Sequence, residues 1–390
     1  MRFAATDPLR GRTMIDVTII GAGITGASAA FHLQKRGITN ISHISRGTPK
    51  ISGLRSRPIP ALGGMADNIT RIEAARGGEV ADAVWRFGDR ALAALTTHCR
   101  EWGVTLATGD HIRAATAPME SRELAIAIDS LQRKGAPVRK GMLHDVAPGA
   151  SLDYPTQIES GKSAAIAGEG LLHSLMGKVS PGDVSRIVPE HGHVTIWIDD
   201  KSFQSQFVIL AAHQNIAAIF PEARDWLVPY ADEVHWVRGK FHPPSFPVGS
   251  TLTWNFGYNG LTRLNDDLYA LRGARFLRRD GGVGQTVAIL QEGVLPKLLN
   301  DVEMFFPGLV DPKPEGSLPF VEIRPCDELP LIGPAPGTER VLLATGYMGH
   351  GFSLGFLAGK CLADLVLNGM SSDLPEIFLP RRLRTMDGTS

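Results

Sequence analysis

The chain has 390 residues, 43% of them hydrophobic and 21% charged, which is typical of a globular protein with a sizeable core and two domains. Its 40 basic and 40 acidic side chains cancel, which excludes a general electrostatic attraction to nucleic acid or to anionic membranes. Three cysteines in no motif fit a reducing compartment, and residues 1–13 contain no apolar segment of a secretory signal, so we expect a cytoplasmic protein.

The first predicted elements are an apolar strand over residues 15–20, a glycine turn, and a helix that ends at Gly37. In this turn Gly21 permits a tight bend, Gly23 lets a pyrophosphate approach the backbone, and Gly26 lets helix and strand pack closely. The free amides and the positive end of the helix dipole would face the phosphates. The pattern therefore predicts a dinucleotide site that comprises Gly21, Gly23, Ile24, Thr25 and Gly26.

The second predicted strand, residues 40–45, ends at Ser45 and is followed by Arg46. A dinucleotide site usually carries an acid here, which binds the ribose hydroxyls. Two interpretations remain open. Ser45 replaces the acid as a weaker hydrogen-bond partner, or Ser45 and Arg46 together hold the 2′-phosphate of NADP.

The middle of the chain alternates loops, helices and strands. Residues 47–64 are rich in Gly, Pro, Ser and Arg and predict a long loop, and a helix with its apolar face between Trp85 and Trp102 follows. Residues 103–165 predict short strands and one helix. Residues 193–198 alternate like a strand, and the apolar run 207–212 predicts a buried strand of a parallel sheet.

In the last third, aromatic residues at strand-like spacing over 225–290 predict an antiparallel sheet. A helix is expected over 295–306 and a strand over 341–345. A second glycine-rich segment, 346–351, leads into a closing helix to about Leu367. Because this apolar C-terminal run also carries charged side chains, we expect no membrane span.

These motifs give the chain a resemblance to a known family. The first glycine turn, Arg238-Gly239, the stretch 324–333 and the segment 346–352 occur in the order seen in the superfamily of D-amino acid oxidase, glycine oxidase and sarcosine oxidase, from Met14 to about Gly369. The resemblance implies FAD as cofactor and oxidation of a C–N bond beside a carboxylate. A hydride would pass from the substrate α-carbon to flavin N5, and water would hydrolyse the imine. The resemblance implies as partners a small amino acid or amine and, as electron acceptor, oxygen or a protein.

Several residues match positions of the superfamily that contact the cofactor. Thr70-Arg71-Ile72 is similar to the segment of sarcosine oxidases that brings an arginine near the flavin ring, and Val184 resembles the position whose backbone meets the adenine. Ala212 and His213 stand where the family usually has Ala-Gly. Phe320 falls near the cysteine that tethers flavin in sarcosine oxidases, which implies non-covalent FAD.

The resemblance also indicates a substrate anchor. Arg324 matches the carboxylate-binding arginine of glycine and D-amino acid oxidases, whereas the lysine that sarcosine oxidases use instead is Ser353 here. Arg324 would hold the carboxylate through two parallel charge-assisted bonds and so fix the α-carbon over the flavin. The alternative is a structural ion pair of Arg324 with Asp327 or Glu328.

The second glycine turn would aim amides and a helix dipole at the pyrimidine edge of the flavin, where negative charge builds on reduction. The alternative is a turn that serves packing alone. Arg71 adds positive charge near the ring or lies at the surface, and His350 lines the site or packs in the core. The candidate catalytic residues are Arg324, Arg71 and His350, and this turn contributes Gly346, Met348, Gly349, His350, Gly351 and Phe352 to the cofactor site.

We therefore expect an α/β fold in which a Rossmann-like FAD-binding domain is interleaved with an antiparallel-sheet substrate domain. The boundaries assign 14–105, 166–222 and 320–370 to the FAD-binding domain, 106–165 and 223–319 to the substrate domain, and 1–13 and 371–390 to extensions.

Other functions remain as alternatives. Ser45 and Arg46 favour an NADP-dependent dehydrogenase, and Ser45 with His213 favours a flavin-binding subunit or inactive relative without its own turnover. Gly351-Phe352-Ser353-Leu354-Gly355 satisfies the nucleophile-elbow pattern of hydrolases, but Ser353 does not follow a strand directly and no histidine comes after His350. His191-Gly192-His193 lacks further ligands at a known spacing, so no metal is expected.

Overall fold

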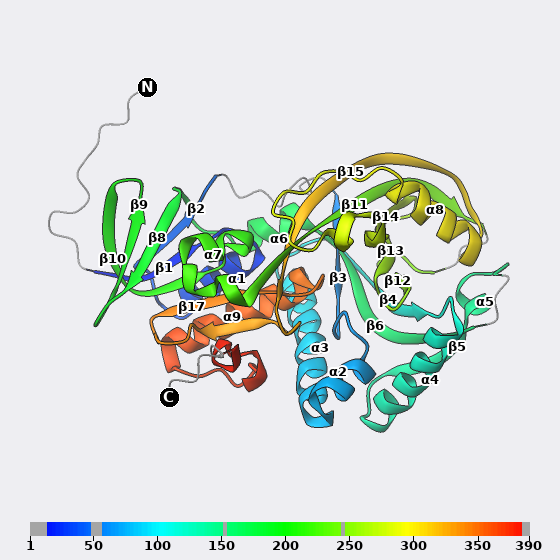
Figure 1. Ribbon diagram of the computed structural model, residues 1–390, viewed down its shortest axis with the longest axis horizontal. Helices are drawn as coiled ribbons and strands as arrows, with labels where there is room; N and C mark the ends of the chain where they lie inside the picture. Colours follow the sequence, from blue (N-terminus) through cyan, green and yellow to red (C-terminus); the bar gives the residue numbers. More distant parts are fainter. Residues whose placement is uncertain (1–13, 48–56, 151–153, 243–245, 384–390) are drawn as a thin grey trace.

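The computed structural model describes residues 14–47, 57–150, 154–242 and 246–383 and contains two large sheets. The first sheet lies at one end of the molecule and the second at the other (Figure 1). The first has eight strands. Six of them follow the order β16–β17–β10–β1–β2–β7, and in addition β9 pairs with β10 and β8 pairs with β9. Their bounds are β1 Ile15–Ile20, β2 Ile41–Ser45, β7 Ser180–Pro181, β8 Val184–Pro189, β9 Val194–Ile198, β10 Lys201–Leu210, β16 Leu331–Pro334 and β17 Val341–Thr345.

The centre of the first sheet is parallel, because β1 runs parallel to β2 and β10, and β10 runs parallel to β17. The crossover from β1 to β2 is α1 (Ile24–Lys35), and the backbone reverses at Gly37, whose φ is +90°. The predicted strand over 207–212 corresponds to the last four residues of β10, which ends at Leu210, so residues 211 and 212 lie beyond it. These elements confirm the expected Rossmann-like half of the fold.

Helices and a β-meander cover the two faces of this sheet. On one face α1 packs with α9 (Gly351–Asn368) and with α3 (Gly78–Glu101) around a core that includes Val17 and Ile19. On the other face β8, β9 and α7 (Ile216–Ile219) pack on Ile20 and Leu210. Strand β1 thus presents Val17 and Ile19 to one core and Ile20 to the other, which explains why most of the strand is apolar.

The second sheet has nine strands, in the order β15–β11–β14–β13–β12–β4–β6–β3 with β5 beside β6. Most of its pairs are antiparallel, as expected, and α8 (Val294–Phe305) covers one face. The strand bounds are β3 Pro58–Leu62, β4 Leu106–Ala114, β5 Val138–Met142, β6 Pro155–Ala167, β11 Leu227–Phe241, β12 Thr251–Trp254, β13 Asn259–Arg263, β14 Leu268–Arg272 and β15 Leu309–Pro325. The remaining helices are α2 Ile69–Arg76, α4 Pro118–Arg133, α5 Leu143–Val146 and α6 Gly168–Leu175, and short 3₁₀ turns are η1 His213–Asn215, η2 Pro221–Trp226, η3 Arg275–Leu277, η4 Arg279–Gly282, η5 Glu376–Phe378 and η6 Pro380–Leu383.

The structure corrects the sequence analysis at two places. The expected loop 47–64 contains β3, which pairs antiparallel with β6 at the edge of the second sheet. The strands expected as far as residue 290 end at Arg272, and η3 and η4 follow, so that the side chain of Phe276 is 59% exposed.

The two sheets do not divide at the expected domain boundaries. Strand β3 lies within the segment 14–105 but belongs to the second sheet, and β15 continues across residue 320. Residues 371–383 of the expected C-terminal extension pack on the fold, since Phe378 is fully buried and Arg382 pairs with Asp327 at 2.7 Å. Residues 1–13 lie outside the described residues.

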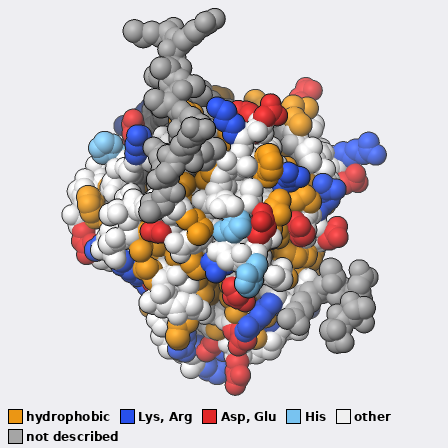
Figure 2. Space-filling model, turned by 90° about the vertical axis from the view of Figure 1, so that its left-hand side faces the viewer, with side chains coloured by type: hydrophobic (Ala, Val, Ile, Leu, Met, Phe, Trp, Pro, Cys, Tyr) orange, Lys and Arg blue, Asp and Glu red, His pale blue; other side chains and the backbone are white. Residues whose placement is uncertain are grey.

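Helix α9 is long and apolar enough to cross a membrane by length and composition, but 61% of that window is buried inside the protein. Packing on α1 and α3 accounts for its apolar surface. At the end of the molecule formed by β8, β9 and β10, acidic, basic and hydrophobic side chains are interspersed (Figure 2). The described residues visible on that face therefore form no large patch of one charge.

Candidate active site

The first glycine turn joins β1 to α1, and its geometry leaves no room for side chains at two of its three glycines. Gly21 has φ +106°, and a Cβ there would lie 2.3 Å from the Ala211 carbonyl oxygen. A Cβ on Gly26 would lie 1.9 Å from the Gly21 carbonyl oxygen. Around Gly23, by contrast, a Cβ would meet nothing within 4 Å, and no side chain caps α1 there. The first-turn amides of α1 are thus available to an anion.

The second glycine turn lies between β17 and α9, and the fold brings it beside the first. The hydroxyls of Thr25 and Tyr347 lie 2.8 Å apart. Further along, a Cβ on Gly359 would lie 2.6 Å from the Thr25 carbonyl oxygen, so α1 and α9 are in backbone contact. In this turn Gly346 and Gly349 have φ of +78° and +87°, and Met348 has φ +52°. Gly351 and Phe352 begin α9.

At the end of β2, Ser45 lies beside β7, and its carbonyl oxygen accepts from the Gly182 amide at 2.9 Å. Arg46 does not stand free for a phosphate, because its Nε lies 2.9 Å from Oδ1 of Asp183. Both side chains are more than half exposed, so this pair contributes little stability. Val184, the expected adenine contact, is buried at the start of β8.

Ala212 and His213 follow β10 at the same edge of the sheet as the first glycine turn. His213 has φ +51°, the left-handed region that favours glycine. The conformation explains why the superfamily carries glycine here, and it shows that this chain keeps the turn despite the larger residue.

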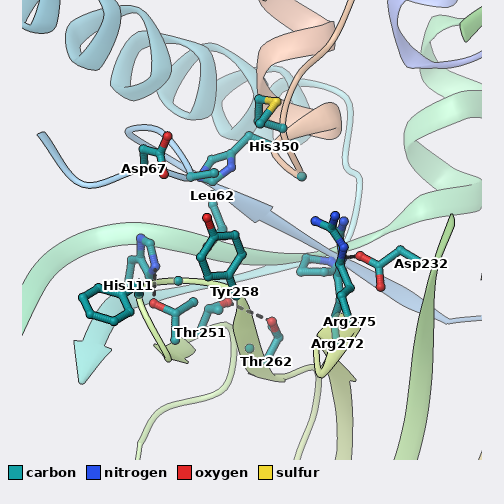
Figure 3. A pocket seen from close by; sticks show the side chains of 18 of the residues that line it. Leu62, Asp67, His111, Asp232, Thr251, Tyr258, Thr262, Arg272, Arg275 and His350 are labelled. Atoms are coloured by element: carbon teal, nitrogen blue, oxygen red, sulfur yellow. Dashed lines mark hydrogen bonds and ion pairs between the residues drawn. The ribbon is translucent and has the colours of Figure 1, made fainter. Parts of the chain in front are cut away.

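A cavity of about 180 Å³ lies between the second sheet and the second glycine turn. Figure 3 shows Arg272, Arg275 and Asp232 grouped on one side, and His350 on the α9 side of Tyr258. The other sides are formed by β4, β12 and β13, by the end of β3, and by the residues that follow β3. The residues that line the cavity include Leu62, Asp67, His111, Arg113, Tyr230, Asp232, Phe256, Tyr258, Arg272, Arg275, Arg324, Glu328, Met348, Gly349 and His350.

Arg272 organises a partly buried ionic network on this wall. Its Nε lies 2.9 Å from Oδ2 of Asp232, and its Nη2 lies 2.9 Å from Oε2 of Glu322, which also accepts from the hydroxyl of Tyr230. Burial raises the pKa of Asp232, whereas Arg272 overcomes the effect of burial and holds the pKa of Glu322 below its ordinary value. A Cβ on Gly349 would lie 3.1 Å from Nη1 of Arg272, so the guanidinium touches the second glycine turn.

Arg113 anchors the opposite side. Its Nε donates to Glu159 at 3.1 Å, and its Nη1 and Nη2 donate to the carbonyl oxygens of Ala66 and Met65 at 2.9 and 2.6 Å. Arg113 therefore fixes the segment after β3 against the second sheet. Nearby, His111 is 1% exposed, and burial holds its pKa well below the ordinary value, so it is uncharged.

His350 lies at the N-cap of α9 and lines the cavity, as expected for a residue of the site. It is 5% exposed, and neither ring nitrogen has a hydrogen-bond partner in the described part of the chain. Burial, helped by the positive charge of Arg113, lowers its pKa to about 4. The ring is neutral at physiological pH and presents unused polar atoms to the cavity.

Arg324 also reaches the cavity, from β15, where its guanidinium carbon lies 5.3 Å from the centre of the Tyr230 ring. Its Nη1 lies 2.7 Å from Oε1 of Glu328, the ion pair that formed the structural alternative. The Nε of Arg324 is buried without a hydrogen-bond partner among the described residues. Glu328 is half exposed, so the pair can open toward a ligand.

Arg71 does not line the cavity. Its Nη2 lies 3.1 Å from Glu123, its Nη1 lies 3.4 Å from Asp67, and its guanidinium covers the Phe256 ring at 4.8 Å. Any effect of Arg71 on the site is therefore indirect, through Asp67 and Phe256, which are wall residues. Thr70, its neighbour on α2, has a buried hydroxyl without a partner within the described ranges.

Ser353 stands at the position where sarcosine oxidases carry a lysine, and it makes a structural hydrogen bond. It is fully buried on α9, and its hydroxyl donates to the Leu62 carbonyl oxygen at 2.5 Å. This placement on a helix, away from any strand end, excludes the nucleophile-elbow alternative. The described residues contain no group of three or more His, Cys, Asp or Glu side chains that could hold a metal ion, and His193 faces Glu190. That no metal is needed stays a prediction.

The sequence analysis missed the ionic wall of the cavity. Tyr230, Asp232 and Val234 alternate along one face of β11, with Arg272 on the neighbouring β14. The available signal was the pair Asp232-Glu233 in the interior of a mostly apolar strand, because buried charges in a strand interior need partners or a ligand.

Comparison with known proteins decides the family. The family model described as FAD dependent oxidoreductase matches residues 16–365. The chain belongs to the family of FAD-dependent oxidoreductases. A search of curated protein sequences found no match.

Solved structures share the fold of this FAD-dependent oxidoreductase. Glycine oxidase from Geobacillus kaustophilus has 18% identity and a TM-score of 0.73, over 93% of this chain and 97% of that one. Iminodiacetate oxidase from Chelativorans sp. has 20% identity and a TM-score of 0.70, over 93% and 98%. L-proline dehydrogenase from P. horikoshii has 15% identity and a TM-score of 0.73, over 95% and 97%. At these identities the likeness establishes the fold.

The cofactor is FAD, and the two glycine turns fit it. The open backbone face of Gly23 and the uncapped amides of α1 suit a pyrophosphate, while Gly21 and Gly26 keep the turn tight. The second turn and the unpartnered polar atoms of Thr70 and His350 suit the flavin end. The family assignment gives no support to the NADP alternative based on Ser45 and Arg46.

Proposed function

We propose that the protein oxidises the C–N bond of an amino acid or secondary amine that carries a carboxylate, with an imine as product. The observation that carries the proposal is Arg324, which places a guanidinium with an unpartnered Nε on a cavity that also borders the second glycine turn. Bound FAD supplies the electron acceptor for this oxidation.

In this proposal the chain's own residues bind and orient the substrate. Arg324 holds the carboxylate, and Glu328 moves aside when the carboxylate replaces it. Arg272, held by Asp232 and Glu322, fixes this wall of the cavity against Gly349 of the second turn. His350 stays neutral, so it forms a polar wall and adds no positive charge that would repel an amine.

Arg324→Lys and Arg324→Ala test the anchor. Lysine cannot reproduce the planar fork of arginine, so both variants should lose activity, the alanine variant by about a hundredfold in kcat/KM, for a loss of roughly 3 kcal/mol. FAD content should stay normal. Arg238→Lys is the matched control, because Arg238 lies in the same sheet and pairs with Glu315 and Asp267 away from the cavity. Unchanged kcat/KM in both Arg324 variants, or loss of FAD from them, contradicts the assignment.

A further inference from the structure

Arg275 is a wall residue of the cavity without a carboxylate partner in the described part of the chain. Of the wall arginines in the described ranges, the others pair with carboxylates: Arg113 with Glu159, Arg272 with Asp232 and Glu322, and Arg324 with Glu328. Among the residues that the structure describes, Arg275 donates only from Nε to the Gly281 carbonyl oxygen, at 3.2 Å. Its side chain is partly buried, and a guanidinium that has lost water without gaining a counterion favours an anion from solution.

A constrained turn holds Arg275 at this position. Strand β14 ends at Arg272, and Gly273 and Ala274 have φ of +133° and +51°. Oδ1 of Asn259 accepts from the Ala274 amide at 2.9 Å, and a Cβ on Gly273 would lie 2.3 Å from the same oxygen. A left-handed alanine costs conformational energy, and such residues concentrate where a side chain must be placed for binding.

The ring of Tyr230 joins Arg275 to the proposed carboxylate anchor. The guanidinium carbon of Arg275 lies 4.2 Å from the ring centre and that of Arg324 lies 5.3 Å from it. Because the hydroxyl of Tyr230 donates to Glu322 and its pKa is raised by burial, the phenol is neutral and does not compensate either charge. Two guanidinium groups therefore contact one aromatic ring, and both residues line the cavity.

We infer that Arg275 binds a second carboxylate, and that the preferred substrates are amines with two carboxylates, that is, dicarboxylic amino acids or N-carboxyalkyl amino acids. One carboxylate is held by Arg324 and the other by Arg275, with the oxidised C–N bond between or beside them. This inference rests on the proposed function. It predicts discrimination against apolar side chains, because such a substrate leaves the Arg275 charge unpaired in a desolvated site.

The first test measures binding without turnover. The holoenzyme is titrated with glutarate and with butyrate, two probes that differ by one carboxylate, and binding is followed by the change in flavin absorbance and by thermal stabilisation. We expect glutarate to bind about thirtyfold more tightly than butyrate, the effect of one charge-assisted contact of about 2 kcal/mol. Arg275→Gln should abolish this preference, while Arg275→Lys should keep part of it.

Arg279→Gln is the matched control, because Arg279 lies four residues further on, is 91% exposed, and pairs with Asp280 outside the cavity. It should behave as the wild type. Equal affinity of the wild type for the two probes overturns the inference, and so does an Arg275→Gln variant that keeps the preference for glutarate. The wild-type comparison is decisive even where a variant folds poorly.

The second test separates the inference from the proposed function. Anaerobic flavin bleaching is compared for aspartate, glutamate and iminodiacetate against alanine and N-methylglycine. Faster bleaching by the dicarboxylic amines, lost in Arg275→Gln, supports both. Equal bleaching by monocarboxylic amines overturns the inference and leaves the proposed function intact. An Arg275-dependent preference for glutarate without bleaching by any amine supports the anion site and contradicts the proposed function.

Discussion

Ser45 replaces, at the end of β2, the acid that usually binds the ribose of a dinucleotide. A carboxylate accepts two hydroxyl bonds and a serine fewer, so Ser45→Glu should tighten FAD binding about tenfold, for a gain on the order of 1 kcal/mol. Titration of the apoprotein with FAD measures this, and Ser45→Gln provides an uncharged side chain of equal length for comparison. Unchanged or weaker binding of the glutamate variant would mean that the local backbone is adapted to serine.

His350 couples stability to pH. Its pKa of about 4 in the folded protein lies below the ordinary 6.5, so the unfolded chain takes up a proton first as the pH falls. The native state is therefore fully favoured above pH 6.5, and this contribution is lost as the pH falls from 6.5 toward 4. Between pH 7 and pH 5 the loss from His350 amounts to about 2 kcal/mol.

The thermal unfolding midpoint at pH 7 and pH 5 measures this coupling. The decrease should be smaller in His350→Gln than in the wild type, whereas the exposed His191→Gln should show the full decrease. His32, whose pKa is also lowered to about 4 by burial, would keep part of the pH dependence in both variants. An equal decrease in His350→Gln and the wild type would show that His350 is already protonated or exposed.

Two glycines beside α1 allow cofactor binding and folding to be tested separately. Gly23 lies in the first glycine turn, and Gly359 lies where α9 contacts α1. Gly23→Ala adds a methyl group where nothing lies within 4 Å, at a φ of −74° that alanine adopts, so the apoprotein should keep its unfolding midpoint. FAD affinity should fall at least about tenfold, because the methyl group occupies the approach of the pyrophosphate.

Gly359→Ala is the complementary variant. Its Cβ would lie 2.6 Å from the Thr25 carbonyl oxygen, so it should lower the unfolding midpoint of the apoprotein, at a cost of about 1–3 kcal/mol. Differential scanning calorimetry and FAD titration of both variants distinguish the two effects. A destabilised Gly23→Ala apoprotein, or one with normal FAD affinity, would contradict the assignment of this turn to the cofactor.

Elements with a local pattern were predictable, and others were not. The apolar strand and glycine turn before α1, and β17 before α9, follow from short-range sequence, and the structure confirms them. Strand β3 was missed because Pro58 and Pro60 are typical of a loop. The sheet tolerates them there because β3 is an edge strand, so its prolines need not donate to a second neighbour.

At the scale of the whole molecule, the cavity joins segments far apart in the chain: the end of β3, β11, β14 and the turn before α9. Arg324 was found through a motif, but Arg272 and Arg275 lie in no motif. The role of Arg272 depends on Asp232 and Glu322, which lie in other strands. The position of Arg275 depends on the turn at Ala274, whose left-handed conformation no sequence pattern predicts. Sequence patterns do not show which charged side chains pair with one another in the folded protein.

The central claim is that this cavity is where an FAD-dependent enzyme oxidises a carboxylate-bearing amine. The most direct measurement is anaerobic mixing of the wild-type holoenzyme with a panel of amino acids and N-alkyl amino acids, followed by flavin absorbance and by analysis of the products. We predict bleaching of the flavin by amines that carry a carboxylate, with release of the oxo acid or aldehyde expected from hydrolysis of the imine. Bleaching only by amines without a carboxylate, or none by any member of the panel, would contradict it.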